Sequence, residues 1–269
     1  MSVVSSLAKL SFCWRFARTP GTFLRLVRHS WAAARRGPVA GPKQKDEPTE
    51  YLLRLANAPN ATALRTYAGD LSILYEIFWQ HAYDLPQLRA GAFRTVVDVG
   101  ANVGLAALFF LEKFPVTRLV CVEPELANFR LLQRNLRGTS AVALHAALDA
   151  TNGVVKIDSS PQAYNAKVSA DTGTTEVAAM SMPTLLRSQG LTWVDLLKID
   201  IEDYEQRVFV GSCDWLAQVG VLLIEIHSPA SYAAVRRAVR AQHFSWEQAT
   251  GRHPDAGLFV ARNPQRCPT

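Results

Sequence analysis

The sequence predicts an α/β protein built on a doubly wound, mostly parallel β-sheet. After Gly91, short apolar segments alternate with segments of helical periodicity, which is the pattern of βαβ units. The last two apolar segments are joined only by a short link that contains Gly and Pro, which predicts a hairpin. The sheet should therefore carry one antiparallel strand near the C-terminus.

The expected elements follow one another along the chain. Core strands are expected at 95–99, 118–122, 141–145, 194–199 and 221–226, and the closing hairpin at 244–248 and 258–261. Helices are expected at 102–113, 125–137, 204–216 and 231–241, where apolar residues recur at helical spacing. A stretch rich in Gly, Ser and Thr covers 151–175, and its flanks, 154–157 and 176–180, could pair as an additional hairpin.

The 269 residues divide into three parts. Residues 1–49 form a basic helical arm and linker, residues 50–90 a helical, aromatic lead-in, and residues 91–269 the α/β domain. A hydrophobic fraction of 49% excludes a mainly disordered chain. The four cysteines lie far apart without a CxxC pair, so the sequence predicts neither a disulfide scaffold nor a zinc finger, and a cytoplasmic location fits.

The net charge of +6 suggests at first a protein that binds polyanions. Nine of the 29 basic residues lie within 1–45, which contains no acidic residue. The rest of the chain holds 20 basic and 23 acidic residues and carries a charge of −3. The basic character therefore belongs to the arm, and the sequence predicts no nucleic-acid partner.

The arm contains two segments of helical periodicity, 7–18 and 22–36, separated by Pro20-Gly21. Large apolar residues, among them Trp14 and Trp31, alternate with arginines. Basic amphipathic helices of this kind can lie in the surface of anionic membranes, so we expect peripheral membrane contact through the arm.

Other interpretations of the arm stay open. It could be a solvated extension, pack on its own domain, or serve as an organelle transit peptide, because it is rich in Arg and free of acids. No apolar run is long enough for a transmembrane helix. Lys9, Arg15 and Arg18 interrupt any apolar run and argue against a secretory signal.

The first core strand ends in a glycine-containing turn, Val97-Asp-Val-Gly-Ala-Asn-Val-Gly104. Gly100 would let the chain turn tightly, and Gly104 would let the next helix begin close to a ligand. Free N–H groups at that helix start favour a carboxylate or phosphate. The spacing differs from GxGxxG, so the dinucleotide fingerprint is not met.

The second strand ends in Cys121-Val-Glu-Pro124. Ligands of such sheets bind at the carboxyl ends of the strands, where Glu123 could accept hydrogen bonds from both hydroxyls of a ribose. Alternatively, Glu123 could be an acid that interacts favourably with the helix dipole.

With these residues placed, the chain resembles the FkbM family of S-adenosylmethionine-dependent methyltransferases over about 70–262. The resemblance is carried by Asp98-Val-Gly-Ala-Asn-Val-Gly104, by Val122-Glu-Pro124 with Asn128 and Asn135 downstream, by Asp195-Leu-Leu-Lys-Ile-Asp-Ile-Glu202 with Glu205, and by Ile224-Glu-Ile-His227. It implies a seven-stranded, Rossmann-like class I methyltransferase sheet over residues 91–269, with S-adenosylmethionine as cofactor. It also implies O-methylation of a small-molecule or carbohydrate acceptor: a sugar, glycan, glycolipid or secondary metabolite.

The resemblance assigns the cofactor contacts. The backbone from Gly100 through Asn102 to Gly104 would hold the methionine end, with Asp98 below its amino group. Glu123, followed by Pro124, would hold the ribose. The loop that ends at Asp149 would lie beside the adenine, where Asp149 could accept from the amino group or simply form a turn.

The reacting end is expected at Lys198-Ile-Asp-Ile-Glu202. Strand alternation points Lys198, Asp200 and Glu202 to one side as the strand runs into the site. A hydroxyl nucleophile benefits from a base, for which Asp200, Glu202 and His227 are candidates. His227 could equally be a strand-end residue bonded to backbone, and Lys198 could pair with a carboxylate.

Two departures affect the acceptor half. The family usually continues the acidic motif as Glu-Gly-Ala-Glu, whereas this chain has Glu202-Asp-Tyr-Glu205. Thr184-Leu-Leu186 replaces the usual Thr-Leu-Asp. Hard cations take carboxylate oxygens, but Asp200 and Glu202 alone do not make a site, so no metal is expected.

Two other functions compete with methyl transfer. An NAD(P)-dependent oxidoreductase could also use Glu123 for a ribose, but the absent GxGxxG and the terminal hairpin count against it. A non-catalytic, membrane-associated protein could have kept the fold, as Asp203 and the basic arm permit.

Overall fold

The computed structural model describes residues 3–36, 46–57, 61–89, 91–158, 167–168 and 175–265. Most of the expected linker, 37–45, and much of the stretch 151–175 lie outside these residues.

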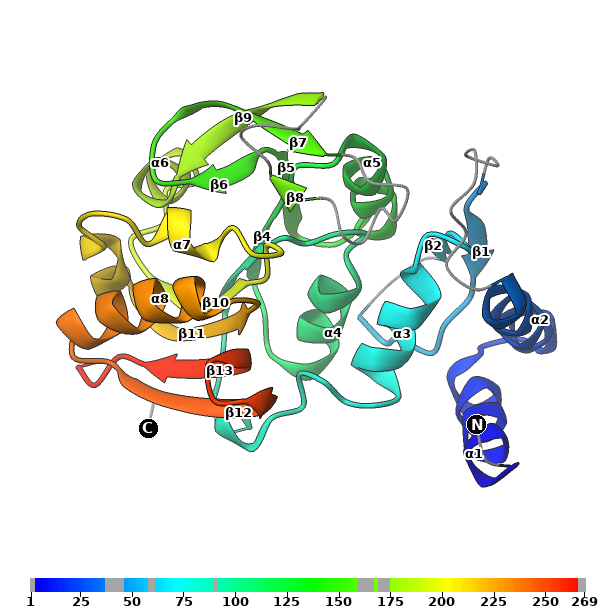
Figure 1. Ribbon diagram of the computed structural model, residues 1–269. Coiled ribbons are helices and arrows are strands. Elements are labelled where there is room, and N and C mark those ends of the chain that lie inside the picture. The colour runs from blue at the N-terminus through cyan, green and yellow to red at the C-terminus, as the bar shows by residue number, and fades with distance from the viewer. Residues whose placement is uncertain are drawn as a thin grey trace.

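A seven-stranded sheet forms the centre of the molecule (Figure 1). Its order is β12 (Ser245–His253), β13 (Ala256–Arg262), β11 (Val219–Ile226), β10 (Val194–Ile199), β3 (Thr95–Val99), β4 (Arg118–Glu123) and β5 (Ala141–His145). The pairs among β11, β10, β3, β4 and β5 are parallel, and β13 is antiparallel to both its neighbours. The predicted doubly wound sheet with one antiparallel strand is confirmed.

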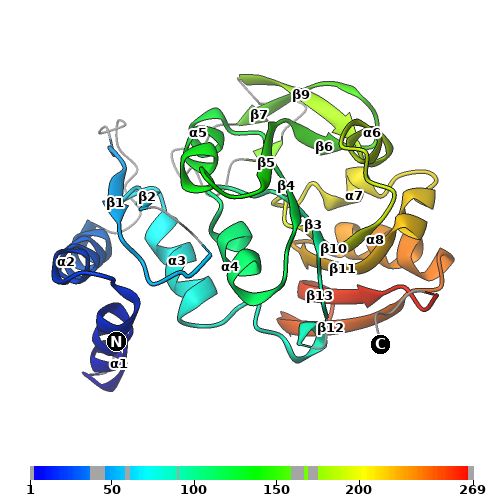
Figure 2. The same ribbon diagram turned by 180° about the vertical axis from the view of Figure 1, so that it is seen from behind.

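Helices cover both faces of this sheet because its strands are apolar on both sides (Figures 1 and 2). Val96 packs into one buried cluster and its neighbour Val97 into the other, as alternation requires. The first cluster contains α3 (Asp70–Phe78), α4 (Leu105–Lys113) and α5 (Leu126–Asn135). The second contains α6 (Met182–Ser188), α7 (Glu205–Val208), the 3₁₀ helix Asp214–Gln218 and α8 (Pro229–Ala241).

Two expected helical regions are wrong in part. The predicted helix 204–216 is only α7, followed by the short 3₁₀ helix, because Gly211 adopts a positive φ of 75° and ends the helical path. The lead-in 50–90 contains one α-helix, α3, a 3₁₀ turn at Pro86–Leu88 and a two-stranded sheet of β1 (Thr49–Tyr51) and β2 (Thr62–Leu64). The carboxamide of Asn135 holds β2 by bonding the backbone N–H and carbonyl of Ala63.

The additional hairpin is confirmed as part of a small second sheet. β7 (Gly153–Asp158) pairs antiparallel with β9 (Thr175–Ser181). The sheet also contains β6 (Ala147–Asp149) and β8 (Lys167–Val168).

The basic arm folds into α1 (Val3–Phe16) and α2 (Pro20–Arg36), at one end of the molecule beyond α3 (Figure 1). Phe12, Cys13 and Leu26 are buried in the same cluster as α3 and α4. The hydroxyl of Tyr75 on α3 lies 3.3 Å from Cys13 Sγ and 2.6 Å from Ser30 Oγ. The arm therefore packs on its own domain. Among the described helices, none is both long and apolar enough to cross a membrane.

Candidate active site

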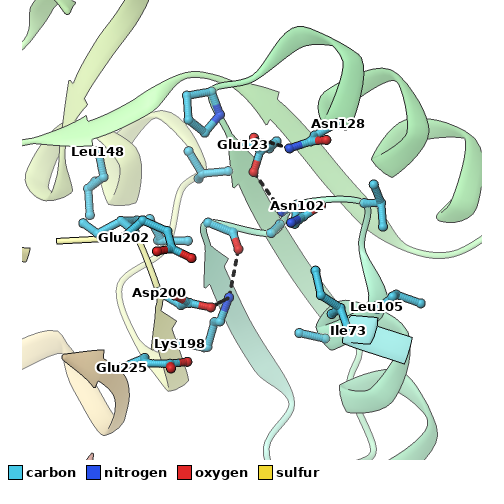
Figure 3. A pocket seen from close by; sticks show the side chains of 18 of the residues that line it. Ile73, Asn102, Leu105, Glu123, Asn128, Leu148, Lys198, Asp200, Glu202 and Glu225 are labelled. Carbon is cyan, nitrogen blue, oxygen red and sulfur yellow. Dashed lines mark hydrogen bonds and ion pairs between the residues drawn. The ribbon is translucent and has the colours of Figure 1, made fainter. Parts of the chain in front are cut away.

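A pocket of about 290 Å³ opens at the carboxyl ends of β3, β4 and β10, where the sequence predicts the site (Figure 3). Its wall includes the turn after β3, the end of β4, the loop after β10 and one side of α3. Seven expected site residues line it: Gly100, Asn102, Glu123, Pro124, Lys198, Asp200 and Glu202.

The turn after β3 depends on glycine at two positions. Gly100 has φ +74°, and a Cβ there would lie 1.7 Å from the carbonyl oxygen of Asp200, so only glycine lets β3 and β10 approach so closely. Gly104 has φ +91° and precedes α4, and a Cβ there would lie 2.9 Å from the side chain of Leu132. Both glycines fix the course of the turn.

Lys198 holds this turn from below. Its ammonium donates to the carbonyl of Gly100 at 2.9 Å and lies 3.0 Å from the buried carboxylate of Asp98. Burial alone would lower the pKa of Lys198, but Asp98 and other negative groups outweigh it and raise that pKa well above its usual value. Lys198 is therefore a charged positioning residue, as the pairing interpretation predicts.

Glu123 is buried at the end of β4. One of its oxygens accepts from the backbone N–H of Asn102 at 2.8 Å (Figure 3), and the other from the N–H of Glu125 at 2.9 Å. Burial raises the pKa of Glu123 to about 7, although these hydrogen bonds oppose the shift. The carboxylate links β4 to the glycine turn and still lines the pocket.

One further observation indicates that the pocket fits S-adenosylmethionine. The side-chain oxygen of Asn102 is buried at the pocket wall and accepts no hydrogen bond from any described residue. A buried acceptor without a donor is costly, so this atom suits a ligand that brings an N–H group, such as the amino group of the cofactor.

A second group of polar side chains lies at the ends of β10 and β11. His227 Nε2 lies 3.8 Å from a carboxylate oxygen of Asp200 and 3.9 Å from one of Glu202. Its Nδ1 is 2.9 Å from Oε1 of the fully buried Glu205. The structure thus brings together three of the four expected catalytic residues, with Lys198 below them.

The pKa values of this group separate its candidate bases. Burial alone would lower the pKa of His227, but the hydrogen bond and charge of Glu205 outweigh it and raise that pKa to about 9. A histidine that keeps its proton at neutral pH is a poor proton acceptor. Burial, with the nearby charge of Asp200, raises the pKa of Glu225 to about 7.

Asp149 lies apart from the other expected cofactor residues. Its carboxylate accepts from the Tyr204 hydroxyl at 3.2 Å and from Arg207 at 3.1 Å. It borders a separate hollow beside β7, whereas the preceding residues Ala147 and Leu148 line the main pocket. Its contacts are those of a structural anchor for α7.

Sequence reasoning missed several residues of the site. Glu225 lines the pocket, lies two residues before His227, and could have been found by its place near the end of β11. Glu76 and Tyr83 reach the pocket from the lead-in, where no motif marks them. The partnership of Glu205 with His227 spans 22 residues and leaves no sequence pattern.

The fold and the pocket together define a class I methyltransferase: a seven-stranded sheet with an antiparallel seventh strand, a glycine turn after its first parallel strand and an acidic residue at the end of the next. The methyltransferase FkbM domain matches residues 98–247, more than half of the chain. The chain belongs to this family and is an S-adenosylmethionine-dependent methyltransferase.

Three proteins illustrate the similarity. The chain is 27% identical over 214 residues to 31-O-demethyl-FK506 methyltransferase FkbM of Streptomyces tacrolimicus, covering 65% of this chain and 81% of that protein. It is 29% identical over 135 residues to hexuronic acid methyltransferase AglP of Haloferax volcanii, covering 49% and 55%. The solved O-methyltransferase of Bacillus cereus superposes with a TM-score of 0.41 at 11% identity, covering 88% and 98%.

Proposed function

We propose that the protein transfers a methyl group from S-adenosylmethionine to a hydroxyl of a sugar, glycan, glycolipid or secondary metabolite. The observation that carries this proposal is the wall of carboxylates beside the cofactor turn. Asp200, Glu202 and Glu225 face the same pocket as the turn after β3. Carboxylates accept hydrogen bonds from hydroxyl groups and can take up their protons.

Residues in different parts of the pocket have different roles in this proposal. When bound, S-adenosylmethionine supplies a methyl group on a positively charged sulfur. Glu123 accepts hydrogen bonds from the ribose hydroxyls, and the turn from Gly100 to Gly104 surrounds the methionine end. Asp200 and Glu202 orient the acceptor hydroxyl, since transfer to a nucleophile depends mainly on its alignment.

The proton of the acceptor hydroxyl has to leave as the new bond to carbon forms. A base acts best when its pKa is near the working pH, which favours Glu225 over His227. The hydrogen bond from Glu205 then holds the imidazole of His227 beside the neighbouring carboxylates.

The relatives support this acceptor class. The names of two of them specify a hexuronic acid and a demethylated FK506, one a carbohydrate and the other a secondary metabolite. Both names imply acceptors with hydroxyl or carboxyl oxygens.

The test is a screen with methyl-labelled S-adenosylmethionine against nucleotide sugars, glycans, glycolipids and hydroxylated metabolites. We expect label on an oxygen of at least one class, and loss of transfer in Asp200→Asn with cofactor affinity retained. Transfer to nitrogen or carbon only would refute O-methylation. Calorimetry with S-adenosylmethionine and NAD separates the oxidoreductase alternative, which requires NAD to bind.

A further inference from the structure

We propose that Asp200, Glu202 and His227 form a binding site for one divalent metal ion at the ends of β10 and β11. One ligand atom from each residue can be chosen so that all three lie within 4.8 Å of one another. The first two come from the loop after β10 and the third follows β11, so the sheet itself brings them together. The site concerns ion binding; only the role of the ion rests on the proposed function.

The distances suit an ion better than hydrogen bonds. His227 Nε2 lies 3.8 Å from Asp200, 3.9 Å from Glu202 and 3.9 Å from Glu225. Each separation exceeds hydrogen-bond length. Two ligands of one ion, each about 2.1 Å from it, lie about 3 to 4 Å apart. Small side-chain rotations, with loss of the proton from His227 Nε2 as the ion binds, would therefore bring three or four ligand atoms onto a common centre.

Glu205 supplies a second, independent observation. It is fully buried, and its Oε1 lies 2.9 Å from His227 Nδ1, which directs Nε2 toward the carboxylates. Its other oxygen accepts no hydrogen bond from the described residues. A carboxylate bound to the far nitrogen of a histidine is the usual support of a metal-binding imidazole, because it fixes the ring and the tautomer.

The nearby lysine does not replace such an ion. Lys198 lies 3.6 Å from Asp200, but only 3.0 Å from Asp98 and 2.9 Å from the carbonyl of Gly100. Its charge therefore serves the cofactor turn. Asp200, Glu202 and Glu225 remain clustered about the imidazole, and a divalent cation would offset their mutual repulsion.

Two carboxylates and an imidazole suit Mn²⁺, Mg²⁺ or Zn²⁺. Such an ion would hold an acceptor oxygen beside the cofactor and ease the loss of its proton. This role fits an acceptor with two neighbouring oxygens, as in a sugar diol or a hexuronic acid.

The experiment is calorimetric titration of the metal-free, full-length protein with Mn²⁺, Mg²⁺ and Zn²⁺, with no methyl donor or acceptor present. We expect one site, with affinity reduced at least about tenfold in Glu202→Gln and in His227→Ala, and measurably in Glu205→Gln. Glu76→Gln removes a carboxylate from the same pocket and should leave affinity unchanged. Thermal melts verify that each variant folds.

Two outcomes would overturn the site: no ion binds below about 1 mM, or binding is indifferent to Glu202→Gln and His227→Ala. In the first case the acids serve the positive sulfur of the cofactor alone, and Glu202→Gln weakens cofactor binding only. Because ion binding is measured without substrates, a failed acceptor screen leaves this result standing.

We infer separately that the outward faces of α1 and α2 bind the surface of a membrane that contains anionic phospholipids. Both helices are two-sided: Phe12, Cys13 and Leu26 are buried against the domain. The opposite sides expose five large apolar residues: Leu7 (63%), Leu10 (39%), Trp14 (59%), Leu24 (64%) and Trp31 (56%). These five, here called the arm face, are almost half of the eleven exposed large apolar residues among those the structure describes.

The positive charge of α1 and α2 indicates that the arm face binds an anionic surface. Residues 3–36 contain seven basic residues and no acid, and Arg28 and Arg35 lie one turn from Leu24 and Trp31 on the same side of α2. No other described element lies beyond these helices in either view (Figures 1 and 2). Exposed Trp and Leu that protrude between arginines suit insertion at the level of lipid headgroups. A second copy of this chain would bring the same positive charge and be repelled.

The test is co-sedimentation of the full-length protein with phosphatidylcholine vesicles, with and without phosphatidylglycerol. We expect binding to the anionic vesicles only, weakened by salt, and reduced at least about tenfold in Trp14→Ala/Trp31→Ala. Val154→Ala/Val210→Ala, which removes apolar groups exposed elsewhere, is the matched control and should bind normally. Absence of binding to anionic vesicles, or equal loss in the control, would overturn the inference, as would a concentration-dependent dimer that the double Trp variant abolishes.

Discussion

The two halves of the pocket differ in how much of their structure exists before any ligand binds. In the cofactor half, Glu123, Lys198 and Asp98 are buried, and contacts of 2.8–3.0 Å join them to the turn, to Glu125 and to one another. In the acceptor half, the carboxylates of Asp200, Glu202 and Glu225 lie 3.8–3.9 Å from His227 Nε2 and are partly exposed. The cofactor half is preformed, whereas the acceptor half awaits a bound group to close it.

The largest expected effect comes from removing a buried charge of the cofactor half. Lys198→Met leaves the buried Asp98 without its partner and should lower the free energy of unfolding by about 3–5 kcal/mol. Asp200→Asn alters the same charge network on its open side and should change that free energy by under about 0.5 kcal/mol. Denaturant unfolding measures both. Equal losses would mean that the two halves are equally preformed.

The next prediction concerns the close approach of β3 and β10. Gly100→Ala should cost about 3 kcal/mol of unfolding free energy, because its φ is positive and its Cβ would meet the backbone of Asp200. Gly190→Ala is the matched control, since Gly190 also has a positive φ but no atom within 4 Å of a Cβ. It should cost about 1 kcal/mol. Similar values for both would show that the turn tolerates more space than the geometry suggests.

Removal of the acid at the end of β4 tests cofactor binding directly. Glu123→Ala should weaken S-adenosylmethionine binding at least about 100-fold, because the variant loses the proposed acceptor for the ribose hydroxyls and the bond to Asn102. Calorimetry gives the affinity, and a melting curve verifies folding. An unchanged dissociation constant in a folded variant would remove Glu123 from the site.

The same carboxyl predicts a pH dependence. Its pKa of about 7 means that it is ionised above neutrality and protonated below. If the ribose binds the ionised form, affinity is constant above pH 7 and falls by up to about tenfold for each pH unit below it. Titrations from pH 5.5 to 8.5 measure this slope. Glu123→Gln, which cannot ionise, should bind weakly with no slope.

The smallest effect lies in the acceptor half. Asp203 has φ +75°, a conformation that favours glycine, and the family usually has glycine at this place. Asp203→Gly should therefore raise the unfolding free energy by about 0.5–1 kcal/mol. A loss of stability on thermal unfolding would show that the Asp203 side chain stabilises the loop.

The sequence predicts the cofactor half better than the acceptor half for a physical reason. A short apolar strand, a glycine and an acid at the next strand end are local patterns, and the parallel sheet brings them together, as found for Gly100 and Glu123. The acceptor half depends on contacts across long separations. The bond between Glu205 and His227 and the approach of Glu76 from α3 have no spacing rule that would reveal them.

Single residues and contacts between distant segments explain the remaining differences between the predicted and observed elements. Apolar residues recur at helical spacing in 204–216, but Gly211 adopts a positive φ and ends the helix, so one backbone conformation overrides the helical pattern. The strands at 49–51 and 62–64 are too short to show alternation; Asn135 from α5 holds the second, and the first pairs with it. Asp149 differs from expectation in two ways: the expected loop 146–149 ends in strand β6, and Arg207 and Tyr204 occupy the carboxylate.

Helix α3 lies between the arm and the pocket and contacts both. On one side the Tyr75 hydroxyl is bonded to Cys13 and Ser30 of the arm. On the other side Ile73, Glu76 and Ile77 line the pocket. Truncation of the arm would uncover one side of this helix and remove both partners, Cys13 and Ser30, of the Tyr75 hydroxyl. Truncation would therefore alter the support of the pocket wall together with the proposed membrane contact, and substitutions on the exposed arm face separate the two effects.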